Sequence, residues 1–209
     1  MSVRVKICGI TSRDDALAAV EAGADALGFM FFAQSPRHVA ARVAVEIVQV
    51  LPPFVAKVGV FVNPSEEEVL RAIAACGLDT VQLHGDERPE ICGRFAVKII
   101  KAFRIRDAAS LKPLPDYRVS AWLLDSYVAG QLGGSGATFN WDLAVQAKKL
   151  GSPVILAGGL TPENVAEAVR HVQPFAVDVS SGVESAPGKK DAAKLRAFVR
   201  AAKGSSPND

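Results

Sequence analysis

The chain has 209 residues, of which 49% are hydrophobic and 22% are charged, and its formal net charge is +2. This length suits one α/β domain with a sizeable core, and the near balance of charge argues against nucleic acid or an anionic membrane as a partner. No apolar run approaches the roughly 20 residues that a membrane-spanning helix needs, and the N-terminus has no secretory signal. We therefore expect a cytoplasmic protein.

The cysteines are few and far apart, at Cys8, Cys76 and Cys92, and the three histidines form no HxxxH pair. This pattern predicts no disulfide framework, no structural metal and a reducing compartment. Cys76 and Cys92 are expected to be structural. We expect the Lys189-Lys190 pair and the scattered arginines to lie on solvated faces.

Residues 3–8 open the chain with apolar side chains at alternate positions, the period of a β-strand with two different faces. Gly9 ends this strand, and Thr11 or Ser12 can cap the helix that follows. Cys8 therefore stands at the carboxyl end of a strand, at the mouth of a strand-loop-helix unit. A free cysteine is more often a small buried hydrophobe, so position alone does not make it reactive.

The rest of the chain repeats the strand-then-helix order. Further strands are predicted over residues 26–30, 56–61, 80–83, 97–103, 121–125, 154–157 and 176–179. Helices are predicted over residues 13–22, 39–51, 66–76, a short stretch through 92, 141–150, a stretch from 162, and 191–202. Eight such units with short apolar strands predict a single α/β domain, a closed (β/α)8 TIM barrel over residues 1–203, with a polar tail over 204–209. A doubly wound open sheet is the competing fold, but it normally uses about five or six strands.

Two loops fit the phosphate site that such barrels commonly form after strands 7 and 8. Gly158-Gly159 lets backbone N–H groups approach an anion, and Ser180-Ser181-Gly182 offers hydroxyls and further N–H groups. A glycine pair can also simply make a tight turn. The occurrence of both loops on neighbouring strands favours phosphate binding.

Polar side chains at other strand ends suggest acid-base chemistry. Asp125 ends strand 6, roughly across the barrel from Cys8, so the two can serve as acid and base. Arg37, in the loop after strand 2, can grip a carboxylate or phosphate. The alternatives are that Asp125 is a solvated aspartate and that Arg37 is an exposed loop charge. Lys6 shares a strand face with Cys8 and can pair with Asp178 on strand 8, and we hypothesise that this pair tunes the thiol.

These blocks together resemble the phosphoribosylanthranilate isomerases of tryptophan biosynthesis. The resemblance runs in register from about residue 3 to residue 200. Its motifs are Lys6-Ile7-Cys8-Gly9-Ile10-Thr11, Ser35-Pro36-Arg37, Val81-Gln82-Leu83-His84-Gly85-Asp86-Glu87, Leu124-Asp125, Gly133-Gly134-Ser135-Gly136, Leu156-Ala157-Gly158-Gly159-Leu160 and Asp178-Val179-Ser180-Ser181-Gly182-Val183-Glu184.

The resemblance implies an Amadori rearrangement of N-(5′-phosphoribosyl)anthranilate, with no metal or cofactor. In the family's pattern Asp125 is the general acid, Cys8 is the general base, and Arg37 holds the anthranilate carboxylate. The loops at 158–159 and 180–182 match the phosphate site. His84 and Asp178 match positions with supporting roles.

Gly134, within the loop 134–136, is implied to help close the site. This loop region departs from the family pattern at Ser135, where threonine is usual, and at Asn140, where aspartate is usual. Ser135 keeps the hydroxyl and Asn140 can still cap a helix, so the departures put loop closure in doubt rather than activity.

Two other functions remain open. One is a histidine-pathway Amadori isomerase on the same barrel, whose substrate carries two phosphates; residues 63–65 and 84–86 do not look like its second phosphate site. The other is a non-catalytic phosphoribosyl-binding barrel, which would have lost the acid or the base. The partner expected is a small phosphorylated molecule. The sequence is equally compatible with a monomer and a homodimer.

Overall fold

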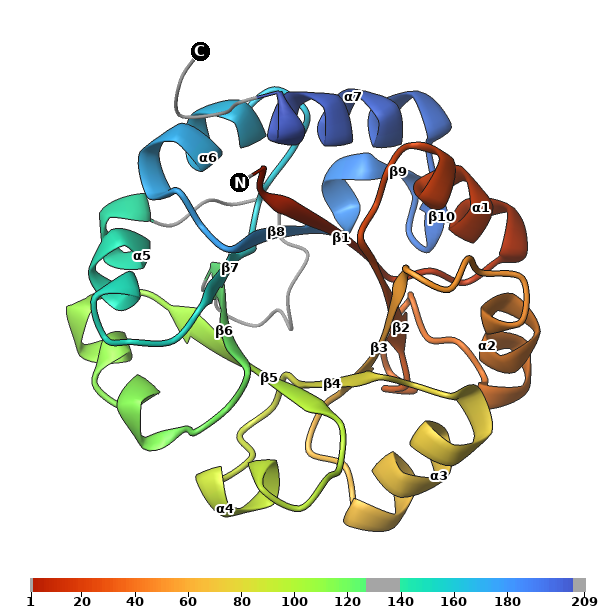
Figure 1. The fold of residues 1–209 in the computed structure, drawn as a ribbon, viewed down its shortest axis with the longest axis horizontal. Helices are drawn as coiled ribbons and strands as arrows, with labels where there is room; N and C mark the ends of the chain where they lie inside the picture. Colours follow the sequence, from red (N-terminus) through yellow and green to blue (C-terminus); the bar gives the residue numbers. More distant parts are fainter. Residues whose placement is uncertain (1, 127–139, 205–209) are drawn as a thin grey trace.

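The computed structural model describes residues 2–126 and 140–204, and Figure 1 shows its eight parallel strands closed into a barrel. The strands follow one another around the barrel in chain order, and β8 pairs with β1. Their bounds are β1 Arg4–Cys8, β2 Ala26–Met30, β3 Ala56–Phe61, β4 Thr80–Leu83, β5 Lys98–Ile105, β6 Ala121–Ser126, β7 Val154–Leu156 and β8 Ala176–Val179. The predicted (β/α)8 barrel is confirmed, whereas the predicted tail from residue 205 onward lies outside the described residues.

Helices surround the barrel on its outer side (Figure 1). Their bounds are α1 Arg13–Glu21, α2 Ala41–Val48, α3 Glu66–Cys76, α4 Pro89–Cys92, α5 Trp141–Lys148, α6 Val165–Val172 and α7 Ala192–Lys203. Caps on the side chain of Ser12 at α1 and of Asn140 at α5 confirm two expected helix starts. No helix in the two described ranges is long and apolar enough to cross a membrane.

The structure corrects the predicted elements in four places. The connection between β5 and β6, for which no helix bounds were predicted, carries two short 3-10 helices, η1 Ala108–Leu111 and η2 Leu114–Asp116, in place of the eighth helix that the alternation implied. α6 begins at Val165 rather than near Pro162, and α2 is shorter than predicted at both ends. A third 3-10 helix and a small hairpin, which the sequence did not predict, follow β8.

Both faces of the strands are buried, which is why the strands read as nearly continuous apolar runs. One apolar cluster fills the layer between barrel and helices, and a second fills the barrel interior. The interior cluster consists of Cys8, Val58, Val60, Ile100, Ala102, Ala121, Leu123, Ile155, Ala157 and Ala176. Because strand side chains alternate, Asp125 follows Ala121 and Leu123 on the inward face and reaches the mouth of the barrel.

One ion pair lies among these apolar interior side chains. Lys6 on β1 stands opposite Asp178 on β8 in the strand register, and Lys6 Nζ lies 2.8 Å from Asp178 Oδ1. Both residues are buried. The pairing expected from the sequence is therefore confirmed, and it exists only because the barrel closes between its first and last strands.

The unpredicted hairpin lies after β8. It follows η3 (Ser181–Val183) and consists of β9 (Glu184–Ala186) and β10 (Lys189–Lys190), which pair antiparallel. Lys189 is exposed as expected, but the prediction is wrong for Lys190, whose side chain is 0% exposed. Sequence alone could not show that this hairpin packs against Thr11 and Asp15, in the segment that follows β1, and covers the second lysine.

Candidate active site

A cavity of about 480 Å³ opens at the carboxyl ends of the strands. It gathers every predicted site residue that the structure describes, whereas Gly134 lies outside the described residues. The predicted residues that line it are Cys8, Arg37, His84, Asp125, Gly158, Gly159, Asp178, Ser180, Ser181 and Gly182. Side chains from β1, β4, β6 and β8 therefore meet at one place, together with the loops after β2, β7 and β8.

The Cys8 thiol occupies space that a glycine on the next strand leaves free. Cys8 stands opposite Gly28 of β2, and a Cβ atom added at Gly28 would lie 2.8 Å from Cys8 Sγ. That distance is shorter than side-chain atoms tolerate, so any larger residue at position 28 would displace the sulfur. The strand pairing thus holds the thiol at the cavity wall, where Cys8 itself is only 6% exposed.

Burial raises the pKa of the Cys8 thiol above its ordinary value, because a thiolate is poorly solvated there. The Lys6 ammonium opposes this shift, the Asp178 carboxylate adds to it, and Lys190 opposes it. Burial also works against the charge of Lys6, but Asp178 and Cys8 outweigh it and raise the pKa of Lys6. Lys6 is therefore a permanent cation beside the sulfur.

Asp125 on β6 faces the residue that follows β4. His84 Nε2 lies 3.3 Å from Asp125 Oδ2, although the two atoms are not aligned as a hydrogen bond. Gln82 Nε2 is 3.0 Å from His84 Nδ1, a contact whose donor depends on the tautomer of His84. The other ring nitrogen, Nε2, faces Asp125.

The loop that carries His84 is held by a buried ion pair. Lys101 Nζ lies 3.0 Å from Glu87 Oε2 and also donates to the carbonyl of Gly85 at 2.8 Å. Glu87 in turn accepts hydrogen bonds from the backbone N–H groups of Gly85 and Asn63. His84 is therefore fixed by the chain that follows it as well as by the strand before it.

The glycine pair after β7 has the backbone geometry that the phosphate hypothesis needs. Gly158 and Gly159 have φ values of +81° and +65°, a region that side chains disfavour. A Cβ atom at Gly158 would come within 2.7 Å of Asp125 Oδ1. Beside this loop, the buried Oγ of Ser180 has no hydrogen-bond partner among the described residues, so it is free to pair with a ligand.

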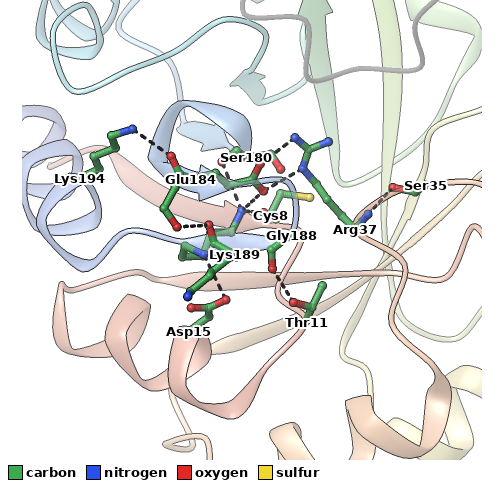
Figure 2. Close-up of polar contacts among 12 residues, drawn as sticks. Cys8, Thr11, Asp15, Ser35, Arg37, Ser180, Glu184, Gly188, Lys189 and Lys194 are labelled. Carbon is green, nitrogen blue, oxygen red and sulfur yellow. Dashed lines mark hydrogen bonds and ion pairs between the residues drawn. The ribbon is translucent and has the colours of Figure 1, made fainter.

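Arg37 does not extend freely into solvent. Its Nε and Nη2 donate to the two carboxylate oxygens of Glu184, each at 2.8 Å, and its backbone N–H donates to Ser35 Oγ at 3.1 Å. Figure 2 shows the Arg37 and Glu184 side chains next to each other and beside Cys8. This bidentate pair raises the pKa of the Arg37 guanidinium further.

Glu184 and Lys190 are site residues that the sequence reasoning did not select. Lys190 Nζ donates to the Cys8 carbonyl at 2.6 Å and to Glu184 Oε1 at 2.9 Å. Burial lowers the pKa of Lys190, against the attraction of Glu184. The Pro187-Gly188 dipeptide was a turn signal that could have revealed the hairpin, but nothing local showed where its side chains would point.

Within residues 2–126 and 140–204, no group of three or more His, Cys, Asp or Glu side chains could hold a metal ion. The chemistry available from the residues described is thus a buried thiol, a carboxylate beside an imidazole, and two places suited to anions.

A family model described as N-(5′-phosphoribosyl)anthranilate isomerase matches residues 5–201. The chain belongs to this family. The family is one of isomerases in tryptophan biosynthesis, and its members are enzymes. The resemblance read from the motifs is thereby confirmed.

Individual relatives agree with this assignment over nearly the whole chain. The N-(5′-phosphoribosyl)anthranilate isomerase of Geobacter metallireducens is 61% identical over 201 residues, covering 96% of this chain and 99% of the relative. That of Geobacter sulfurreducens is 60% identical, covering 97% and 99%. The crystal structure of the Thermotoga maritima phosphoribosylanthranilate isomerase has a TM-score of 0.92 at 44% identity, covering 97% and 99%.

A second solved isomerase structure holds reduced 1-(o-carboxyphenylamino)-1-deoxyribulose 5-phosphate; its TM-score is 0.88 at 43% identity, and the match covers 97% of this chain and 99% of that one.

Proposed function

We propose that this phosphoribosylanthranilate isomerase family member converts N-(5′-phosphoribosyl)anthranilate to 1-(2-carboxyphenylamino)-1-deoxyribulose 5-phosphate, with Asp125 as acid and Cys8 as base. The observation that carries the proposal is that both side chains line one cavity, together with the loops suited to phosphate. All of these residues belong to one chain, so the proposed reaction is compatible with a monomer or a homodimer.

The reaction begins with proton transfer from the Asp125 carboxyl to the furanose ring oxygen. The ring then opens to a Schiff base whose nitrogen is protonated. This step leaves a carboxylate on Asp125, and His84 Nε2, 3.3 Å away, is on the right side to stabilise it by donating a proton in a hydrogen bond. His84 is therefore a supporting residue for the acid.

Cys8 then removes the proton from C2′. The electron pair of the C–H bond forms a double bond with C1′, and the iminium nitrogen accepts the displaced electrons. The resulting enolamine tautomerises to the ketone. The positive charge of the iminium favours a nearby thiolate, which offsets the burial that raises the pKa of Cys8. Lys6 supports the thiolate from the other side.

The two anionic groups of the substrate match two parts of the cavity. The phosphate fits the loops at Gly158-Gly159 and Ser180-Ser181-Gly182, where Ser180 Oγ lacks a protein partner among the described residues. The anthranilate carboxylate fits Arg37. The ligand in the related isomerase structure, as its name states, carries both a carboxyphenyl group and a 5-phosphate.

The test is turnover of phosphoribosylanthranilate, generated in situ and followed by the loss of its fluorescence. Cys8→Ser and Asp125→Asn should each lower kcat by about 10²–10⁴-fold, the usual contribution of a positioned acid or base. Both variants should still bind the reduced product analogue. Cys92→Ser, which removes a buried thiol outside the cavity, is the matched control and should keep its activity.

Two outcomes would contradict the proposal. Full activity in Cys8→Ser or Asp125→Asn would exclude that residue from the chemistry. A wild-type protein that binds phosphorylated sugars but does not turn over this substrate would leave the fold in place and exclude the activity.

A further inference from the structure

The pairing of Arg37 with Glu184 uses one particular edge of the guanidinium. A guanidinium has five N–H donors, one on Nε and two on each Nη. Glu184 accepts hydrogen bonds from Nε and Nη2, so it occupies the side edge of the guanidinium, which these two nitrogens form. The donors left for a ligand are the two on Nη1 and the second on Nη2. These form the terminal edge, which can bind another carboxylate through two parallel hydrogen bonds.

Glu184 is itself held in place from several directions. The ammonium of Lys190 contacts Glu184 Oε1 at 2.9 Å, and Lys194 Nζ donates to the Glu184 carbonyl at 2.9 Å. Burial disfavours the charge of Glu184, but Arg37 and Lys190 outweigh it and lower the pKa of this carboxyl. Glu184 is therefore a fixed anion with little freedom to release Arg37.

The hairpin that carries these residues is tied to the N-terminal part of the chain. Thr11 Oγ1 donates to the Gly188 carbonyl at 2.6 Å, and the Lys190 backbone N–H donates to Asp15 Oδ2 at 3.2 Å. Figure 2 shows both contacts beneath the Arg37–Glu184 pair. These contacts fix the hairpin that carries Glu184 to the loop after β1 and to the start of α1.

We propose that Glu184 is the positioning residue for carboxylate recognition, and that it acts by presenting only the terminal edge of Arg37 to the anthranilate carboxylate. Lys190 supports this role because it holds the Glu184 carboxylate and the Cys8 carbonyl together. The inference rests on the proposed function. It predicts that Glu184 favours binding of a negatively charged group although Glu184 is itself negative.

The test compares two unreactive ligands, so that it does not depend on turnover. One is reduced 1-(o-carboxyphenylamino)-1-deoxyribulose 5-phosphate, and the other is the same compound without its carboxyl group. Their Kd values are measured by calorimetry for wild type, Glu184→Gln, Arg37→Met and the double variant. Glu67→Gln, which alters an exposed glutamate paired with Arg71 on the outer surface, is the matched control.

Glu184→Gln should weaken binding of the carboxylated ligand by about tenfold to a hundredfold, the range for losing an ordered hydrogen bond to a charged group. The Kd of the carboxyl-free ligand should change less than about twofold, because this ligand has no carboxylate for Arg37 to bind. The double variant should bind no more weakly than Arg37→Met, since Glu184 acts through Arg37. Lys190→Met should show the same ligand dependence.

Three results would overturn the inference. Equal weakening for both ligands would show general damage to the site. Tighter binding of the carboxylated ligand by Glu184→Gln would show that Glu184 only repels it. Equal affinity of wild type for both ligands would show that Arg37 does not recognise the carboxylate. Turnover by wild type is measured separately, so failure of the proposed function is distinguishable from failure of this inference.

Discussion

At the scale of single residues, the site depends on balancing charges that are expensive to bury. Cys8 lies between two ammonium groups, Lys6 and Lys190, and each of these is paired with a carboxylate. Isolated buried charges would be strongly unfavourable, whereas each ammonium here has a carboxylate that offsets part of this cost. The consequence for Cys8 is a thiol whose pKa is raised by burial and held back by its neighbours.

The first prediction concerns Lys6→Met. Removing the ammonium takes away the larger of the two charges that oppose the effect of burial on Cys8 and leaves Asp178 unpaired, and both changes raise the pKa of Cys8 further. The fraction of thiolate at a given pH should therefore fall, and the pH midpoint of Cys8 alkylation should move upward. The double variant Lys6→Met/Asp178→Asn should shift less, because the Asp178 charge is also gone.

Cys76 and Cys92 also react with alkylating reagents once exposed, so the same measurement in a Cys8→Ser background provides the baseline. An unchanged midpoint in Lys6→Met would refute the hypothesis that this pair tunes the thiol. The double variant keeps the test informative, because breaking a buried ion pair by removing one partner costs about 3–5 kcal/mol and can prevent folding.

At the scale of elements, the loops after the strands carry the binding geometry and the helices provide support. α3 shows the supporting role: Ser65 and Glu68 form a reciprocal capping box at its start, and Gly77 ends it in a left-handed conformation. The loop after β7 uses the same left-handed conformation at Gly158 for another purpose, close approach to the acid. Glycine therefore ends a helix at position 77 and allows close approach to Asp125 at position 158.

Comparison of Gly158→Ala with Gly77→Ala tests this difference. Both glycines have positive φ, so each alanine should cost about 1–2 kcal/mol of stability from backbone strain, and Gly158→Ala should cost more because its Cβ would also collide with the backbone nitrogen of Ser126. A Cβ atom at Gly77 meets nothing within 4 Å, whereas one at Gly158 crowds Asp125 Oδ1. Only Gly158→Ala should therefore lose kcat, by at least about tenfold, since a misplaced acid is less effective.

Chemical denaturation measures the first effect, and the fluorescence assay measures the second. If Gly77→Ala lowered kcat as much as Gly158→Ala, the loss would come from reduced stability and the role assigned to the glycine beside Asp125 would be wrong.

At the scale of the whole molecule, closure of the barrel creates the site. Cys8, Asp125 and Asp178 lie on three different strands and His84 follows a fourth. The Lys6–Asp178 and His84–Asp125 contacts join residues that are far apart in the sequence. A ligand in this cavity contacts elements from both ends of the chain. Binding should therefore stabilise the entire fold rather than one region.

A melting experiment with the reduced product analogue tests this expectation. At a ligand concentration of one hundred times Kd, linkage predicts about 2.7 kcal/mol of added stability. For a chain of this size, this corresponds to a rise in Tm of about 5–11 °C. Ribose 5-phosphate, which lacks the carboxyphenyl group, should need a much higher concentration for the same rise. Absence of any shift at saturating analogue would contradict binding in the barrel mouth.

The sequence by itself determined the barrel, its strand positions and the residues that reach the mouth. Apolar runs and alternation depend on local spacing, which a single chain displays directly. The same local signals failed between β5 and β6, where short 3-10 helices replace an α-helix, and at the hairpin after β8.

The Lys6–Asp178 pair followed from the strand order, but only the tertiary structure decided how Arg37 and Lys190 pair and that Lys190 is buried. We expected Lys190 to be exposed because a lysine pair is usually solvated. The hairpin instead buries its side chain, which contacts Glu184 and the Cys8 carbonyl. We expected the Arg37 guanidinium to be free to bind an anion, yet its Nε and Nη2 already donate to Glu184. These contacts join residues that lie more than a hundred positions apart or depend on the path of a short hairpin. Local sequence patterns do not show these two pairings, because they depend on where the hairpin after β8 packs against the rest of the barrel.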